Sequence, residues 1–222
     1  MSALGEAGIV VLEVLIVLIA LFYAFWNLWF SRRPARTTPS DPKLITSPAN
    51  GKVAVVRKFD TTKGKKTLTA KKWNRGSVEF LASDVAEKGW FVLIVMTPLD
   101  VHWQRAPAAG KVLSIKHTRG KFRNAVKAPE KLLALENEKN EILIDAGEKS
   151  SKRRLKVVQI AGILARRIRC RVQSGQEIEK GAVIGFIDLG SQVAVLLPET
   201  VSIRVKPGEI VVDGETVIGA WT

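Results

Sequence analysis

A long, mostly apolar run, Gly8 to Phe30, lies near the start of the chain. It exceeds the roughly 20 residues that a helix needs to cross a bilayer. Its last turns are rich in tyrosine and tryptophan, and arginines follow it, a pattern typical of the end of a membrane-spanning helix. We therefore predict that residues 1–30 form an N-terminal transmembrane anchor.

The residues that flank this run favour a retained anchor and predict its orientation. A cleaved signal peptide would have basic residues ahead of a shorter apolar stretch, whereas Glu6 precedes this one. Arg32, Arg33 and Arg36 follow it, and arginines gather on the cytoplasmic side of membrane helices. The sequence thus predicts a single-pass protein of the cell membrane whose remaining domain lies in the cytoplasm.

Residues 31–43 separate the anchor from the rest of the chain. They hold three prolines and show no apolar period, which is typical of a short, stiff linker. We predict a basic, proline-rich tether that keeps the following domain, residues 44–222, close to the lipid.

Beyond residue 43 the apolar positions mostly alternate, and β-branched runs are separated by Gly and Pro. Such a pattern is typical of short strands joined by turns. The clearest runs are KVAVV, WFVLIVM, VVQIAGI and VAVLLP. We predict a mainly β domain of the α+β class.

Two weak internal repeats favour a barrel-like or hammerhead-like arrangement of these strands. SPANGKV at 47–53 recurs as APAAGKV at 106–112, and the spacing of VQSGQEIEKGAVI at 172–184 recurs in VKPGEIVVDGETV at 205–217. In the second repeat each glycine would turn the chain between short strands, as in biotinyl and lipoyl carrier domains. A carrier usually has methionine beside its modified lysine at a hairpin tip, and the chain's two methionines lie outside both repeats. The carrier function is therefore the weaker alternative.

Charge limits the class of partner. The formal net charge is +14, and residues 52–75 contain nine Lys or Arg against one acid, Asp60. A second basic cluster, KSSKRRLK, lies at 149–156. Basic surfaces bind nucleic acid or anionic lipid, and the sequence has no zinc-ligand spacing, RNP motif or recognition helix. With an anchor present, we predict that the partner is a membrane with anionic lipid, and that no nucleic acid is bound.

The single cysteine, Cys170, excludes an intramolecular disulfide framework and fits a reducing compartment. It lies in the alternating stretch RRIRCRV, so a small buried strand residue is the preferred interpretation over a nucleophile. No metal site is predicted.

One apolar run, FIDLGSQVAVLLP at 186–198, resembles a buried strand but contains Gly190 and Ser191. Glycine weakens a strand interior, and a serine hydroxyl needs a partner there. A serine hydroxyl can also attack the preceding carbonyl where glycine lets the backbone bend, which replaces the peptide bond by an ester. Elimination and hydrolysis would leave a pyruvoyl group, whose ketone forms a Schiff base with an amine and accepts electrons as carbon dioxide leaves.

Four stretches carry a resemblance that makes this chemistry a specific hypothesis. They are SPANGKV; TPLDVHWQRAPAAGKV; ENEKNEILI with VVQIAGILARRIRC; and LGSQVAVLLP, ending in VKPGEIVVDGETVIG. In this order, over nearly the whole chain after the tether, they resemble the phosphatidylserine decarboxylases, in particular the short bacterial and archaeal type that includes archaetidylserine decarboxylases. The resemblance implies a self-cleaving, pyruvoyl-dependent, membrane-bound carboxy-lyase that converts the serine headgroup of an anionic phospholipid to ethanolamine.

The resemblance also implies roles for individual residues. Gly190 and Ser191 match the cleavage site, with Ser191 as the precursor of the covalent pyruvoyl cofactor and a large and a small chain as products. His102, in the D-x-H motif, matches the histidine that takes the serine proton and later assists decarboxylation. Arg105 stands where longer members have a second histidine, and it would bind the phosphate or carboxylate of the substrate.

Asn50 is the main departure from the family pattern, which has an aspartate in S-P-A-D-G. Asparagine accepts a hydrogen bond, but it cannot stabilise an imidazolium by charge. We keep Asn50 among the catalytic residues and expect slower self-cleavage unless Asp60, Asp84 or Asp100 supplies the charge.

Two other functions stay open. One is a relative that has lost self-cleavage and binds anionic phospholipid without catalysis. The other is a lipoyl-like or basic adaptor module. The oligomeric state is open as well, with a homodimer as one alternative.

Overall fold

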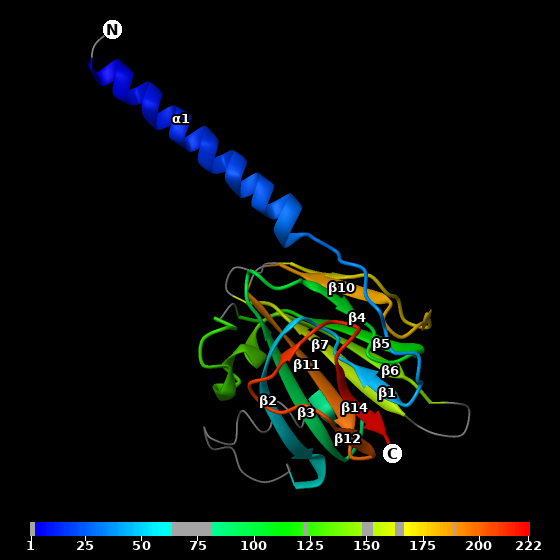
Figure 1. The fold of residues 1–222 in the computed structure, drawn as a ribbon. Helices are drawn as coiled ribbons and strands as arrows, with labels where there is room; N and C mark the ends of the chain where they lie inside the picture. Colours follow the sequence, from blue (N-terminus) through cyan, green and yellow to red (C-terminus); the bar gives the residue numbers. More distant parts are fainter. Residues whose placement is uncertain (1–2, 64–80, 122–123, 148–152, 163–166, 189) are drawn as a thin grey trace. The chain divides into compact units, whose positions relative to one another are not determined.

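The computed structural model describes residues 3–63, 81–121, 124–147, 153–162, 167–188 and 190–222 (Figure 1). Parts of the basic stretches at 52–75 and 149–156, and Leu189 of the L-G-S motif, lie outside these residues. The chain divides into two units, Met1–Pro34 and Ala35–Thr222. The first holds the helix and the second holds the sheets.

The first unit is one helix with an aromatic end. Helix α1 spans Ala3–Ala24 and continues into a π-helical segment, η1, at Phe25–Phe30. The stretch Ala7–Phe30 is long and apolar enough to cross a membrane. Past its end, the guanidinium of Arg32 lies 4.4 Å from the ring centroid of Trp29 and donates to the carbonyl oxygen of that residue. An apolar helix that ends in a paired tryptophan and arginine fits an anchor whose polar end reaches the interface.

The second unit is built from strands, which confirms the predicted mainly β class. In chain order the strands are β1 (Leu44–Thr46), β2 (Gly51–Asp60), β3 (Lys88–Met96), β4 (Trp103–Arg105), β5 (Gly110–Thr118), β6 (Lys139–Asp145), β7 (Arg154–Ile160), β8 (Ile168–Cys170), β9 (Glu177–Ile178), β10 (Val183–Ile187), β11 (Ser191–Pro198), β12 (Val201–Ile203), β13 (Ile210–Val211) and β14 (Val217–Trp221). Short 3₁₀ segments lie at Thr61–Lys63 (η2), Pro129–Lys131 (η3) and Leu133–Glu136 (η4).

In the described part of the chain these strands form three antiparallel sheets (Figure 1). The largest has the order β13-β2-β3-β11-β7-β6-β5-β9 and curls into a half-barrel. The two smaller sheets are β1-β14-β12 and β4-β10-β8. This arrangement agrees with the barrel-like prediction.

The central strand β11 is buried on both faces. Val193, Val195 and Leu197 belong to one apolar cluster, which includes residues of both small sheets. Ala194 and Leu196 belong to a second cluster, which includes residues of η4 and of the turn that starts at residue 81. Because apolar residues cover both faces, the sequence of this strand is a continuous apolar run and does not alternate.

The stretch FIDLGSQVAVLLP is two strands, and the expectation of one buried strand is wrong. Strand β10 ends at Ile187 and belongs to a small sheet, whereas β11 begins at Ser191 in the middle of the large sheet. Gly190 lies where the chain crosses between them, and its φ of +70° is in the left-handed region that glycine adopts readily. The Gly-Ser pair therefore marks a junction between two sheets.

Both internal repeats correspond to repeated structure. SPANGKV and APAAGKV lead into β2 and β5, which begin at Gly51 and Gly110. In the other repeat, the four matched glycines all have positive φ, and they precede or separate the short strands as predicted. The first repeat places two strand starts in the large sheet, and the second forms turns beside the small sheets.

The predicted tether, residues 31–43, is divided between the two units. Its second half contacts the β domain. The backbone N–H of Thr37 donates to Glu215 Oε1 at 2.9 Å, and Lys180 Nζ donates to the carbonyl oxygen of Asp41. Residues 35–43 therefore pack as part of the β domain.

Candidate active site

Ser191, the first residue of β11, is completely buried. It pairs with Met96, the last residue of β3. Its Oγ has no hydrogen-bond partner among the described residues. Leaving a buried polar group without a partner costs about 1–3 kcal/mol, so most buried hydroxyls have one. This exception lies next to Gly190, whose left-handed conformation bends the chain directly before Ser191.

His102 lies between β3 and β4 and is also completely buried. Its Nδ1 is 2.9 Å from the carbonyl oxygen of Asp100. Because a carbonyl oxygen only accepts, Nδ1 carries the proton, and in the neutral imidazole Nε2 is then the basic nitrogen. His102 is therefore oriented to take up a proton through Nε2.

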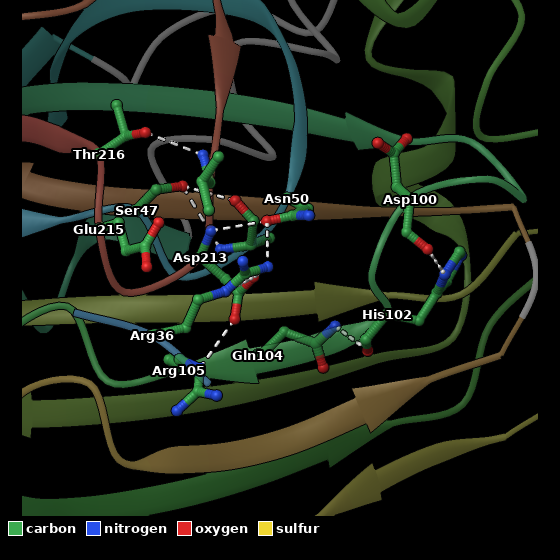
Figure 2. Close-up of polar contacts among 12 residues, drawn as sticks. Arg36, Ser47, Asn50, Asp100, His102, Gln104, Arg105, Asp213, Glu215 and Thr216 are labelled. Atoms are coloured by element: carbon green, nitrogen blue, oxygen red, sulfur yellow. Dashed lines mark hydrogen bonds and ion pairs between the residues drawn. The ribbon is translucent and has the colours of Figure 1, made fainter. Parts of the chain in front are cut away.

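The side chain of Asp100 closes the turn that leads to His102. Figure 2 shows the backbone carbonyl of Asp100 facing the imidazole. Its Oδ2 accepts hydrogen bonds from the backbone N–H and from the hydroxyl of Thr97, both at 2.7 Å. The carboxylate thus shapes the turn, while the backbone carbonyl of the same residue orients the imidazole.

Three buried amide side chains form a chain of hydrogen bonds that ends at the main chain of His102. Asn140 Nδ2 donates to Gln159 Oε1 at 2.9 Å, and Gln159 Nε2 donates to Gln104 Oε1 at 2.8 Å. Gln104 Nε2 then donates to the carbonyl oxygen of His102 at 2.7 Å. A Cβ on Gly185 would lie 2.3 Å from Gln159 Nε2, so glycine leaves room for this chain. Satisfied buried networks favour one arrangement, and this one links β6 and β7 to β4 and fixes the backbone of the histidine.

Ser191 and His102 share a neighbour. Gln104 Nε2 lies 3.9 Å from Sδ of Met96, the strand partner of Ser191, and the same nitrogen donates to His102. The N–H of Ile187, at the end of β10, donates to the carbonyl oxygen of His102 at 3.2 Å. The predicted nucleophile and the predicted base thus lie in one buried neighbourhood at the sheet junction.

Asn50 and Arg105 lie in a second cluster, and Figure 2 shows Gln104 between it and His102. At its centre is Asp213, whose side chain is 1% exposed. Arg36 Nη2 is 2.6 Å from one carboxylate oxygen and Arg105 Nε is 2.8 Å from the other. Asn50 Oδ1 accepts from the backbone N–H of Asp213 at 2.8 Å and from Arg36 Nη2 at 3.3 Å. Two guanidinium groups thus share one buried carboxylate.

Comparison with known proteins assigns the chain to a family. The family model for phosphatidylserine decarboxylase matches residues 23–219. The chain belongs to the phosphatidylserine decarboxylase family. It is 32% identical over 194 residues to the phosphatidylserine decarboxylase proenzyme of Pelobacter propionicus, covering 87% of this chain and 76% of the relative. It is 34% identical over 193 residues to the same proenzyme of Rhodospirillum rubrum, covering 87% and 72%.

An archaeal relative is similar over most of its length. The chain is 36% identical over 196 residues to the putative archaetidylserine decarboxylase proenzyme of Methanocaldococcus jannaschii. The matched region covers 87% of this chain and 88% of the relative. Membership of the phosphatidylserine decarboxylase family confirms the resemblance found in the sequence motifs. The names of the relatives support a decarboxylase of phospholipid metabolism that is made as a proenzyme.

The residues that the family pattern picks out have two different surroundings. Ser191 and His102 lie at the sheet junction, whereas Asn50 and Arg105 surround Asp213. The contacts of Asn50 are with this second cluster, and Arg105 Nη1 also donates to the carbonyl oxygen of Gly181 at 2.9 Å. The pairing of Asn50 with His102 and the contact of Arg105 with substrate stay predictions.

The three carboxylates considered as substitutes for the family aspartate have other partners. Asp60 and Asp100 each accept from a nearby threonine, and Asp84 forms an ion pair with a buried lysine. The carboxylate beside Asn50 is that of Asp213, which sequence reasoning did not single out. The sequence signal that could have pointed to Asp213 lies in the repeat of residues 172–184 and 205–217. The second copy has V-V-D-G where the first copy has I-E-K-G.

Asp213→Asn is expected to lower the free energy of unfolding by about 3 kcal/mol, the low end of the range for breaking a buried ion pair, because it leaves two partly buried guanidinium groups without this counter-charge. Denaturant unfolding of the full chain in detergent would measure this, in a Ser191→Ala background that keeps the chain in one piece. Glu215→Gln is the control, since it changes a less buried carboxylate in the same turn. An equal loss in both variants would contradict a special role for the buried pair.

Burial raises the pKa of Asp188, three residues before Ser191, although Arg169 and Arg167 act in the opposite direction. An acid whose pKa is raised by folding favours the protonated form, so its contribution to stability is largest at low pH and falls as pH rises. Asp188→Asn should therefore raise Tm at pH 7, and the gain should shrink toward pH 4. Thermal melts at both pH values test this, with Glu199→Gln as an exposed control; a gain that grows toward pH 4 would contradict it.

Cys170 lies in strand β8 as predicted, but it is only partly buried. Its Sγ is 3.4 Å from the carbonyl oxygen of Val172, which is consistent with a weak thiol donor. Within the described residues, no group of three or more His, Cys, Asp and Glu could hold a metal ion.

Proposed function

We propose that this chain is a membrane-anchored decarboxylase of phosphatidylserine or archaetidylserine that cuts itself between Gly190 and Ser191. The observation that carries the proposal is the buried Ser191 hydroxyl, which has no hydrogen-bond partner among the described residues. It directly follows a glycine with φ of +70°. A nucleophile placed beside a bent backbone, in a family whose named relatives are proenzymes, supports self-cleavage at this bond.

Self-cleavage begins with attack of Ser191 Oγ on the carbonyl carbon of Gly190. The Oγ proton passes to His102 Nε2, the new C–O bond forms, and the C–N bond breaks as the nitrogen takes up a proton. An ester then joins the two residues. Removal of the Cα proton of Ser191 expels the Gly190 carboxylate and leaves dehydroalanine, which loses ammonia on hydrolysis and becomes a pyruvoyl group.

The residues around Ser191 fit this small cofactor. Position 191 is fully buried, and its hydroxyl makes no hydrogen bond with the described residues that conversion would break. The basic nitrogen of His102 belongs to the same neighbourhood. A pyruvoyl group supplies a ketone that condenses with the substrate amine and accepts electrons as carbon dioxide leaves. His102 would hold or donate a proton at Nε2, and the positive charge around Arg105 suits an anionic headgroup.

The mass of the purified full-length protein tests the proposal. Cleavage gives a large chain, residues 1–190, and a small chain, residues 191–222, whose blocked N-terminus carries a ketone that reacts with hydrazides. An intact chain of 24.4 kDa would contradict self-cleavage. In that case binding to vesicles with anionic lipid would test the alternative, a lipid-binding relative without catalysis.

We also propose that α1 spans the cell membrane and leaves the β domain in the cytoplasm. The apolar stretch Ala7–Phe30 and the arginines that follow it support this orientation. In right-side-out membrane vesicles, a C-terminal tag should be protected from added protease, whereas inverted vesicles should expose it. Exposure of the tag in right-side-out vesicles would reverse the assignment.

A further inference from the structure

Gly162 lies two residues beyond the end of β7, and the carbonyl oxygen of Gly190 points toward it. A Cβ on Gly162 would lie 1.5 Å from the carbonyl oxygen of Gly190 and 2.7 Å from its carbonyl carbon. Among the glycines that the structure describes, this is the closest approach to a neighbouring atom. Any side chain at position 162 would therefore displace the carbonyl group of the bond proposed to be cut.

The segment that holds Gly162 is fixed and cannot easily move away. The backbone N–H of Ala161 donates to the carbonyl oxygen of Glu138 at 2.9 Å, and its carbonyl oxygen accepts from Asn137 Nδ2 at 2.7 Å. On the other side, the Cβ of Ala125 would be 3.3 Å from a Cβ on Gly162. Ala125 is also linked to the residue that follows Ser191, because Gln192 Nε2 donates to the carbonyl oxygen of Ala125.

Gly162 and Gly190 are glycines for different physical reasons. A Cβ on Gly190 would meet no atom within 4 Å, but the residue has φ of +70°. Gly162 has no positive φ, but it has no room for a Cβ. Position 190 requires a backbone conformation, whereas position 162 requires space.

We infer that Gly162 is a positioning residue for self-cleavage: because it has no side chain, it leaves room for the Gly190 carbonyl oxygen, and the carbonyl can stay where Ser191 Oγ can attack it. This inference rests on the proposed cleavage at Gly190–Ser191. In the attack the Oγ–C bond forms, the Oγ proton goes to His102, and the C–N bond breaks with protonation of the nitrogen. A carbonyl shifted by about 1 Å is enough to slow such a step by about 100-fold.

Gly89 provides a matched control. A Cβ on Gly89 would lie 2.0 Å from the carbonyl oxygen of Leu197, so it also meets a backbone carbonyl of β11. Gly89 pairs with Pro198, which lies at the opposite end of β11 from Ser191. Gly89→Ala therefore imposes a similar steric conflict on the same strand without touching the proposed cleavage site.

The experiment measures how fast uncut precursor disappears after synthesis in the wild-type chain, in Gly162→Ala and in Gly89→Ala. In parallel, the Tm of each variant is measured in a Ser191→Ala background, in which the chain stays uncut. We expect the precursor of Gly162→Ala to disappear about 100-fold more slowly than that of the wild type. The rate for Gly89→Ala should stay within about threefold of the wild-type rate, although the two variants should lose a similar amount of Tm. Hydroxylamine, which cleaves esters, should release no fragments from the Gly162→Ala precursor, because the block precedes the ester.

Each other outcome overturns a specific statement. Wild-type chain that stays uncut contradicts the proposed function itself. If wild type is cut, then equal cleavage of Gly162→Ala, or a slowing in both variants in proportion to their Tm, overturns the role of Gly162. A Gly162→Ala chain that fails to fold where Gly89→Ala folds also overturns it, since it assigns Gly162 to the fold.

Discussion

Ser191→Ala is expected to leave one uncut chain of 24.4 kDa with no decarboxylase activity. The substitution removes the atom that we propose attacks the Gly190 carbonyl, and with it the proposed precursor of the pyruvoyl group. The fold should be retained, because the hydroxyl has no hydrogen-bond partner among the described residues and its removal leaves none unsatisfied. Mass spectrometry of the purified chain and release of carbon dioxide from a serine phospholipid measure the two effects.

Ser202→Ala is the matched control, since Ser202 is exposed on β12. It should be cut and active like the wild type. Ser191→Cys should keep slow cleavage, because a thiolate also attacks carbonyls. A small fragment that persists in Ser191→Ala would move the cleavage site elsewhere and remove the basis of the proposed function.

His102→Gln is expected to slow self-cleavage by about 10²–10⁴-fold, the usual contribution of a positioned general base. Glutamine is neutral and fills similar space, but it has no basic nitrogen to take the Ser191 proton. The small fraction that matures should also decarboxylate slowly, because the same nitrogen holds a proton near the reacting carbon. A time course of precursor loss gives the first effect, and activity per mature chain gives the second.

His117→Gln is the natural control, because the chain has two histidines and this one is half-exposed. Its Nε2 lies 3.4 Å from Glu138 Oε1, on the outer strand pair β5 and β6. We expect wild-type cleavage in this variant. Wild-type cleavage in His102→Gln as well would show that another group takes the serine proton.

The strand content could be predicted from the sequence because it follows from local pattern. β3 and β11 contain the apolar, β-branched runs WFVLIVM and VAVLLP, which the sequence predicts as strands. The separation of β10 from β11 could not be predicted, because apolar residues continue on both sides of Gly190. Only pairing with distant strands shows that the two segments belong to different sheets.

The site could be predicted only where it depends on short motifs. L-G-S and D-x-H pointed to Ser191 and His102 as candidates, but no motif pointed to Gly162 or Asp213. Gly162 becomes a candidate because the segment after β7 meets the Gly190 carbonyl, and Asp213 because its hairpin meets the loop that holds Asn50. Such contacts between residues far apart in sequence leave no periodic or spacing signal in a single chain.

The position of β11 has a consequence for the mature protein. Cleavage before Ser191 would make this strand the start of the small chain, yet it pairs with β3 on one side and β7 on the other, both in the large chain. The same small chain would add β13 to the edge of the large sheet and β14 beside β1. The two chains could not separate without opening the central sheet, so the cut enzyme would be a tight heterodimer. After denaturation its recovery would be bimolecular and dependent on protein concentration, whereas the uncut precursor would refold as one chain.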